Sequence, residues 1–74
     1  MTLNQAPLNT TLVLVGSTNL DDAQARRLSA LGLRTGAQVR LVQRLAGGAR
    51  VVAVAGARVA IGAKILDKLN VEAA

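Results

Sequence analysis

The sequence predicts a mainly β domain, a small barrel of about five short strands with one α-helix between the first two. Three observations lead to this fold class. Stretches rich in valine and leucine recur along the 74 residues, glycine-containing turns separate them at short intervals, and one segment changes to a helical period. No repeat, low-complexity tract or long linker interrupts the chain, so we expect a single domain, residues 1–74.

The first strand and the start of the helix can be placed from residue types. Residues 10–15 are mostly β-branched or apolar and predict the first strand. Asn19 is the expected N-cap of the helix that follows, which runs to about Leu31. Asp21 and Asp22 then place negative charge in its first turn, where the helix macrodipole favours it.

The apolar residues of this helix fall on one face, which we expect to pack against the barrel. They are Leu20, Ala23, Leu28 and Leu31. Arg27 projects near the middle of that face, where an unpaired guanidinium would be costly. We therefore expect its stem to cover the barrel and its head to bond to carbonyl groups, with direct contact to a partner as the alternative.

The end of the helix is marked more clearly than its start. Gly32 can adopt the left-handed conformation that closes a helix, because it has no Cβ to clash. Leu33 then falls opposite Leu28, which is the apolar contact expected of a Schellman cap. We therefore expect Gly32 to close the helix.

Glycine-containing turns separate the remaining strands. Gly36 marks a turn, residues 46–49 supply a hairpin loop, and Gly56 with Ala57 makes another tight turn. The expected elements are strands at residues 39–45, 50–55 and 58–61, a helical turn at 62–68 and a last strand at 69–72. No second connection is long enough to hold a crossover helix, so an antiparallel SH3-like barrel is the economical fold, and its closure would hide the strand edges.

The sequence offers few groups for catalysis. Histidine and cysteine are absent, and the side-chain carboxylates are Asp21, Asp22, Asp67 and Glu72. Asp21 and Asp22 are adjacent on a helix, where successive side chains diverge by about 100°, so they suit capping better than paired acid–base work. We therefore expect no enzyme activity and no required cofactor. The four carboxylates could hold a divalent metal only weakly, across two molecules.

The chain is strongly basic. Nine lysines and arginines against four acidic residues give a formal net charge of +5, which favours an acidic partner: nucleic acid, an anionic membrane surface or an acidic protein face. Arg40 and Arg44 should point to the same side of their strand, and Arg50 and Arg58 could add to that basic surface. A solvated barrel face is the simpler alternative.

The N-terminal segment indicates the cellular compartment of the protein. Residues 1–20 carry no charged side chain, but several polar residues interrupt the apolar character and no basic residue precedes it. The segment is too polar to span a bilayer and lacks the positive start of a signal peptide. We therefore expect a cytoplasmic protein.

The order of these residues resembles the core domain of the ferrous iron transport protein A (FeoA) family over about residues 8–72. The central signature is Arg27-Leu28, then Leu31-Gly32-Leu33, then Gly36, with two residues between the parts. Around it stand Val13, Val15, Val39, Val51 to Val54, Gly56, Val59 to Ile61, Leu69 and Val71. Two positions depart from the pattern: Thr35 where the family often has proline, and Gly62 where a basic residue is common.

The resemblance implies an SH3-like fold and a cytoplasmic accessory role in ferrous iron uptake, with a GTP-binding membrane transporter as partner. The expected structural residues are Leu28, Leu31, Gly32, Leu33, Gly36 and Gly56. The expected partner-binding residues are Arg26, Arg27, Arg34, Arg40 and Arg44. The alternative is a nucleic-acid-binding or regulatory barrel, against which the absence of aromatic residues weighs because single-strand binders stack bases on them. Self-association stays open.

Overall fold

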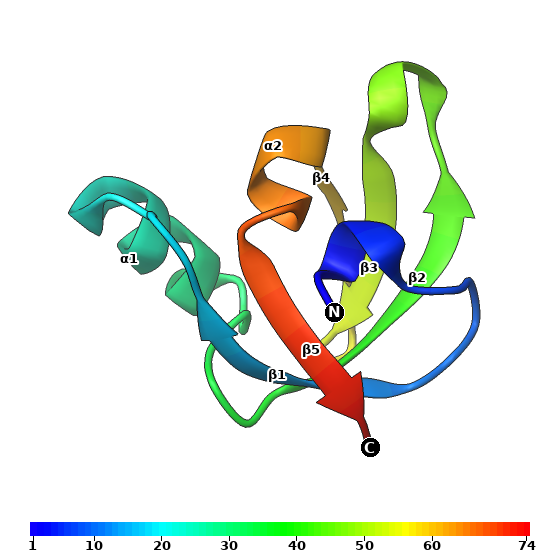
Figure 1. Ribbon diagram of the computed structural model, residues 1–74, viewed down its shortest axis with the longest axis horizontal. Helices are drawn as coiled ribbons and strands as arrows, with labels where there is room; N and C mark the ends of the chain where they lie inside the picture. The colour runs from blue at the N-terminus through cyan, green and yellow to red at the C-terminus, as the bar shows by residue number, and fades with distance from the viewer.

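The computed structural model describes residues 1–74 and contains a single antiparallel sheet of five strands. The strands are β1 (Leu12–Ser17), β2 (Gln38–Arg44), β3 (Arg50–Val54), β4 (Ala57–Ile61) and β5 (Leu69–Ala73). The helices are α1 (Asp22–Ala30) and α2 (Ala63–Leu66), with 3₁₀ turns η1 (Leu3–Gln5) and η2 (Ala46–Gly48). The strand order is β4-β3-β2-β1-β5, and α1 connects β1 to β2 (Figure 1). The predicted fold class is confirmed.

Strands β2 to β5 lie within one residue of their predicted limits, but β1 begins later than predicted. The reason is a bend before it. Asn9 has a positive φ of 61°, and its N–H donates to the carbonyl of Leu41 at 2.7 Å. Residues 8 and 9 are therefore tied to β2, and the extended run along β5 starts only at Leu12.

The sheet is strongly curved but is not closed by hydrogen bonds. Strands β4 and β5 lie at its two ends and do not pair with each other, so hydrogen bonds do not join the two edges that closure was expected to hide. The edge of β5 is covered by the N-terminal residues. The N–H of Val71 donates to the carbonyl of Met1 at 2.9 Å, and Thr2 forms an antiparallel bridge with Asn70.

The core lies inside the curve of the sheet and is built from small and medium aliphatic side chains. Its buried members are Leu3, Ala6, Leu12, Leu14, Leu28, Leu33, Val39, Leu41, Val52, Val54, Ile61, Leu66, Leu69 and Val71. Leu3 and Ala6 precede residues 8–72, the stretch that resembles the FeoA core domain, yet both are buried. The pairing of the N-terminus with β5 brings them in.

Helix α1 begins differently from the sequence prediction. Asp21, not Asn19, is the N-cap: its carboxylate accepts a hydrogen bond from the N–H of Gln24 at 2.7 Å, and the Gln24 Oε1 accepts one from the Asp21 N–H at 3.3 Å. This reciprocal pair is a capping box. Asn19 has a φ of 56°, whereas an N-cap residue needs extended backbone.

The helix also turns a different face to the sheet than predicted. Leu28 is buried and Leu20 is partly buried, but Ala23 and Leu31 are exposed. Leu28 and the partly buried Ser29 mark the side of α1 that faces the sheet, and exposed Ala25 lines the groove beside them. Arg27 lies about 100° from Leu28, on the side away from Ser29. It is therefore exposed and does not cover the barrel.

The predicted Schellman cap is confirmed. Gly32 has a φ of 94°, the Leu33 N–H donates to the Leu28 carbonyl at 2.8 Å, and the Gly32 N–H donates to the Ser29 carbonyl at 3.0 Å. Leu28 and Leu33 are both buried in the core. The cap therefore fixes the point at which the chain leaves α1 for β2. Neither helix has the length and apolar character needed to cross a membrane.

Candidate partner-binding surface

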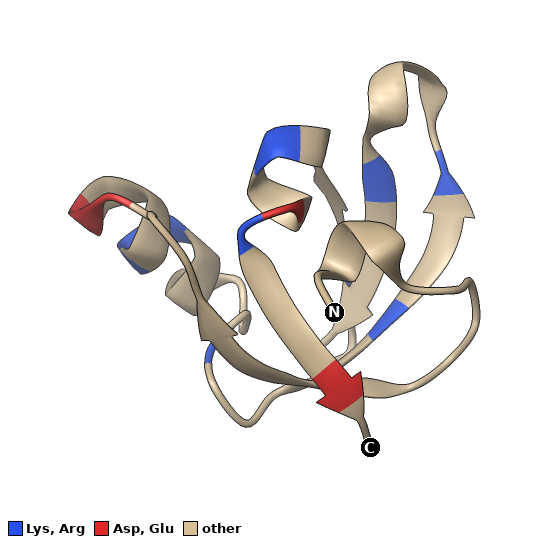
Figure 2. Cartoon of the chain, in the orientation of Figure 1, with Lys and Arg blue, Asp and Glu red and all other residues tan.

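The arginines do not form one patch but fall into three groups (Figure 2). The first group, on α1 and the turn after it, contains Arg26, Arg27 and Arg34. The second, on the sheet, contains Arg40 and Arg58. The third, at the β2–β3 hairpin, contains Arg44 and Arg50. The five predicted binding residues are thus spread over all three groups.

In the helix group, Arg26 and Arg27 are exposed on α1 and free to meet a partner. Arg34 is held more firmly, because its Nη2 donates to the Ser29 carbonyl at 3.3 Å. A cation is favoured at the C-terminal end of a helix, where carbonyl groups lack helical partners. Arg34 therefore supports the end of α1 as well as presenting charge.

Arg40 and Arg44 lie on opposite faces of β2, so the prediction that they share a side is wrong. Arg40 pairs with Ala53, and Leu41 pairs with Val52. The register then shifts between Leu41 and Gln43, which places Arg44 opposite Arg50. Arg50 is two residues from buried Val52, so both lie on the inner face of β3, and Arg44 opposite Arg50 lies on that face too. Ala53 and its partner Arg40 lie on the outer face. One extra residue in a strand reverses the faces beyond it.

Arg44 and Arg50 face each other directly at the start of the hairpin. Like charges in such a cross-strand pair are destabilising. The Arg50 guanidinium is engaged, since its Nη1 donates to the Ala6 carbonyl at 3.5 Å, and the residue is only partly exposed. Arg44 is exposed and is the member of this group that a partner can reach.

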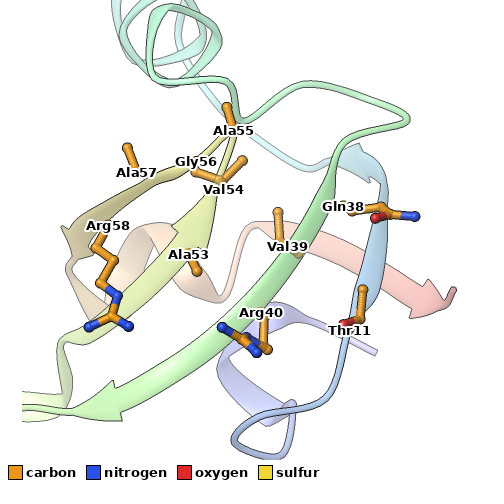
Figure 3. A pocket seen from close by; sticks show the side chains of 10 residues that line it. All are labelled: Thr11, Gln38, Val39, Arg40, Ala53, Val54, Ala55, Gly56, Ala57 and Arg58. Carbon is orange, nitrogen blue, oxygen red and sulfur yellow. The ribbon is translucent and has the colours of Figure 1, made fainter.

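Arg40 and Arg58 form a row with Ala53 between them. Arg40 pairs with Ala53 across β2 and β3, and Ala53 pairs with Arg58 across β3 and β4. Both arginines are exposed, and they line a shallow hollow of about 370 Å³ on the outer face of the sheet. The close-up shows the Arg40 and Arg58 side chains on either side of Ala53 (Figure 3).

The sequence predicts Arg58 only as an addition to the basic surface and does not predict that it pairs with Ala53. That pairing depends on the position of the β3–β4 turn. Val54 pairs with Ala57, so the turn residues are Ala55 and Gly56, both with positive φ. Placing the turn at Gly56 and Ala57 instead would pair Arg58 with Ala55. The turn at Ala55 and Gly56 therefore places Arg58 opposite Ala53.

The candidate metal ligands are not brought together. No three acidic side chains form a cluster that could hold an ion. Asp21 is occupied in the capping box, and an Asp67 carboxylate oxygen accepts a hydrogen bond from Asn4 Nδ2 at 2.7 Å. The acidic residues lie at the start of α1, beside α2 and on β5 (Figure 2).

A second hollow lies between α1 and the sheet. It has a volume of about 190 Å³, and its apolar lining includes Leu14, Leu20, Leu28, Leu33 and Leu69. Its polar lining comes from Ser17, Ser29, Arg34 and Thr35. It contains no acidic residue, and Arg34 is the charged group on its rim.

The FeoA domain family model matches residues 1–73 of the chain. Among solved structures, the FeoA protein of Stenotrophomonas maltophilia, crystallised with zinc, is 32% identical with a TM-score of 0.80. That match covers 97% of this chain and 89% of the other. The relative is described as a procaryotic SH3 domain protein and a possible bacterial ferrous iron transport activating factor.

More distant structures share the fold. The FeoA protein of Chlorobium tepidum is 20% identical, with a TM-score of 0.89 over 99% of this chain and 70% of that one. A manganese-dependent transcriptional repressor is 20% identical, with a TM-score of 0.81 over 93% of this chain and 39% of that one. No curated protein sequence matches the chain. The SH3-like prediction is confirmed.

Proposed function

Because the chain belongs to the FeoA family, we propose that it is an accessory protein of ferrous iron transport that binds the GTP-binding membrane transporter. The single observation that carries this is the family match over residues 1–73. The 32% identical relative, described as a possible ferrous iron transport activating factor, supports the same role. We place this activity in the cytoplasm, where the GTP-binding part of such a transporter would meet its nucleotide.

The proposed mode of action is binding without chemistry. A net charge of +5 steers the protein toward an acidic surface and raises the rate of encounter. Arg26, Arg27, Arg40 and Arg44 are exposed and supply that charge, while Arg34 sits at the end of α1. The short connections and the Schellman cap hold these side chains on a defined scaffold.

We propose that this role requires no bound cofactor. The carboxylates already engaged by Gln24 and Asn4 would have to leave those partners to bind an ion. Weak binding of a divalent metal between two copies of the chain stays compatible with the proposal, because each copy would then supply only part of the ligand set.

The decisive experiment combines binding and transport. Purified protein is tested for pull-down of the transporter's soluble GTP-binding domain, and ferrous iron uptake is measured in a strain lacking the protein, with and without the wild-type gene. The proposal expects binding and restored uptake together. A variant with Arg26→Glu, Arg40→Glu and Arg44→Glu should lose both while its denaturation curve stays near wild type. Normal uptake in the strain without the gene would overturn the proposal.

A regulatory, nucleic-acid-binding barrel is the competing function. The manganese-dependent repressor is similar over 39% of its own chain at 20% identity, so this similarity supports a shared fold and not a shared function. A titration with short DNA and RNA duplexes distinguishes the two functions, because phosphate binding weakens steeply as salt rises. Tight, salt-sensitive binding of duplex without transporter binding would favour the repressor-like function.

A further inference from the structure

We propose that Arg40, Ala53 and Arg58 form a carboxylate-binding site that takes an extended acidic segment of a partner protein. We call these three residues the arginine row. The inference deepens the proposed function and rests on it in one respect, that the partner is a protein. It adds the residues that recognise the partner and the chemistry that they recognise.

The register of the sheet creates the row. Arg40, Ala53 and Arg58 lie side by side on β2, β3 and β4, and all project from the outer face. Neighbouring strands are about 4.8 Å apart, so the Cα atoms of the two arginines are about 10 Å apart. The methyl group of Ala53 leaves the space between them open, as the close-up of the hollow shows (Figure 3). A larger residue at this position would fill that space.

The charges of the row have no counter-charge within the protein. The hollow is lined by Thr11, Gln38, Val39, Arg40, Ala53, Val54, Ala55, Gly56, Ala57 and Arg58, none of which is acidic. The arginines whose guanidinium groups do bond to carbonyls are Arg34 and Arg50, on other parts of the surface. Anionic groups bound at Arg40 and Arg58 would offset their mutual repulsion and accept hydrogen bonds from the planar fork of each arginine.

The rest of the hollow favours a polypeptide over a nucleic acid. Its floor and rim consist of small side chains from the end of β3 and the turn, so a main chain can approach closely. Thr11 and Gln38 add neutral hydrogen-bonding groups at the β2 side. The chain has no aromatic residue on which a base could stack.

The spacing of the arginines predicts the motif. In an extended segment, alternate side chains point to the same side and are about 7 Å apart. Two carboxylates in an acidic-x-acidic sequence that crosses β3 can therefore reach Arg40 and Arg58 together, over Ala53. A single carboxylate could engage both arginines only by drawing them closer. The row should thus prefer paired acidic residues to isolated ones.

The test uses the peptide acetyl-Ala-Glu-Ala-Glu-Ala-amide, its Gln-for-Glu counterpart and a short DNA duplex, titrated into the isotopically labelled protein by NMR. Arg40→Gln with Arg58→Gln should weaken binding of the Glu peptide about tenfold or more, since two charge-assisted contacts are lost. Ala53→Leu should weaken it without changing the charge. Lys64→Gln with Lys68→Gln removes the same charge from α2 and the turn after it, outside the predicted partner-binding residues, and is the matched control.

The outcomes separate the site from the function. Peptide shifts confined to β2, β3 and β4, lost in the arginine-row variants and kept in the control, support the site. Equal weakening in both double variants, or binding of DNA in preference to the Glu peptide, overturns it. Transporter pull-down is measured alongside: a wild-type protein that binds the peptide but not the transporter refutes the proposed function and leaves the site standing. A transporter complex insensitive to the row variants overturns the assignment of the transporter's acidic segment to the row.

Discussion

Gly32 packs directly against Ala55, so closely that a Cβ on Gly32 would lie 2.9 Å from the Cβ of Ala55. The two residues come from different parts of the chain. Gly32 closes helix α1, and Ala55 begins the turn between β3 and β4. Their contact seats the end of the helix on the sheet, so Gly32 is required both for its backbone conformation and for its size.

Replacing Gly32 by Ala should lower the free energy of unfolding by about 2 kcal/mol or more. A side chain at φ 94° is strained by about 1–2 kcal/mol, and the contact with Ala55 adds the cost of overpacking. Gly36→Ala is the matched control, because Gly36 has a φ of 93° but open space around its Cβ position. Chemical denaturation of both variants gives the comparison. Equal losses would show that the Ala55 contact contributes nothing.

A double-mutant cycle isolates the contact itself. Ala55 has a positive φ of 52°, so Ala55→Gly removes strain in the turn while adding flexibility to the unfolded chain, and the variant alone should be close to wild type in stability. In that background Gly32→Ala should cost about 1 kcal/mol less than in the wild type, because the opposing methyl group is gone. Additive effects of the two substitutions would contradict a direct clash.

Much of the fold was predictable because local signals and tertiary packing agree. The valine-rich segment of β3 matches its predicted start, and the Gly32–Leu33 pair forms the expected Schellman cap. The start of α1 was mispredicted because Asn19 and Asp21 are both good capping residues. Backbone conformation decides between them, because the left-handed φ of Asn19 excludes it as the N-cap.

The candidate site was harder to predict because it depends on register. The prediction that Arg40 and Arg44 share a face assumes a regular strand, and the shift between Leu41 and Gln43 breaks that assumption. In the same way, a one-residue error in the β3–β4 turn moves the partner of Arg58 by two residues. Neither the bulge nor the turn position follows from residue type alone in a segment of small aliphatic side chains.

The capping box at the start of α1 gives a third prediction. Asp21→Ala should destabilise the protein by about 1 kcal/mol, because the Gln24 N–H loses its acceptor. Asp22→Ala is the control: Asp22 lies in the first turn and contributes only through the macrodipole, about 0.3–1 kcal/mol at low salt. Thermal unfolding at low and high salt should show a salt-dependent effect for Asp22 and a largely salt-independent one for Asp21. The same salt response for both would remove the capping assignment.

The facing arginines at the hairpin give a fourth prediction. Arg44→Glu should stabilise the protein by a few tenths of a kcal/mol up to about 1 kcal/mol, since it converts a like-charge cross-strand pair with Arg50 into an opposite-charge pair. Arg44→Gln should give part of this gain by removing the repulsion alone. Denaturation curves at several salt concentrations check the order, Glu above Gln above wild type, with the differences shrinking as salt rises. A destabilised Arg44→Glu variant would mean that the pair is not in contact.

The last prediction concerns divalent metals. Removing them with a chelator should leave the melting temperature unchanged, because structural metal sites draw on several clustered ligands and the carboxylates here do not gather in threes. Adding zinc at millimolar concentration tests the remaining route, an ion held between two copies of the chain. If that route operates, zinc should increase the apparent mass in sedimentation, and the increase should be lost in a variant with Asp21→Asn, Asp22→Asn, Asp67→Asn and Glu72→Gln. A melting temperature that falls sharply in chelator would instead place a metal within the folded monomer, and the proposal that no cofactor is required would be wrong.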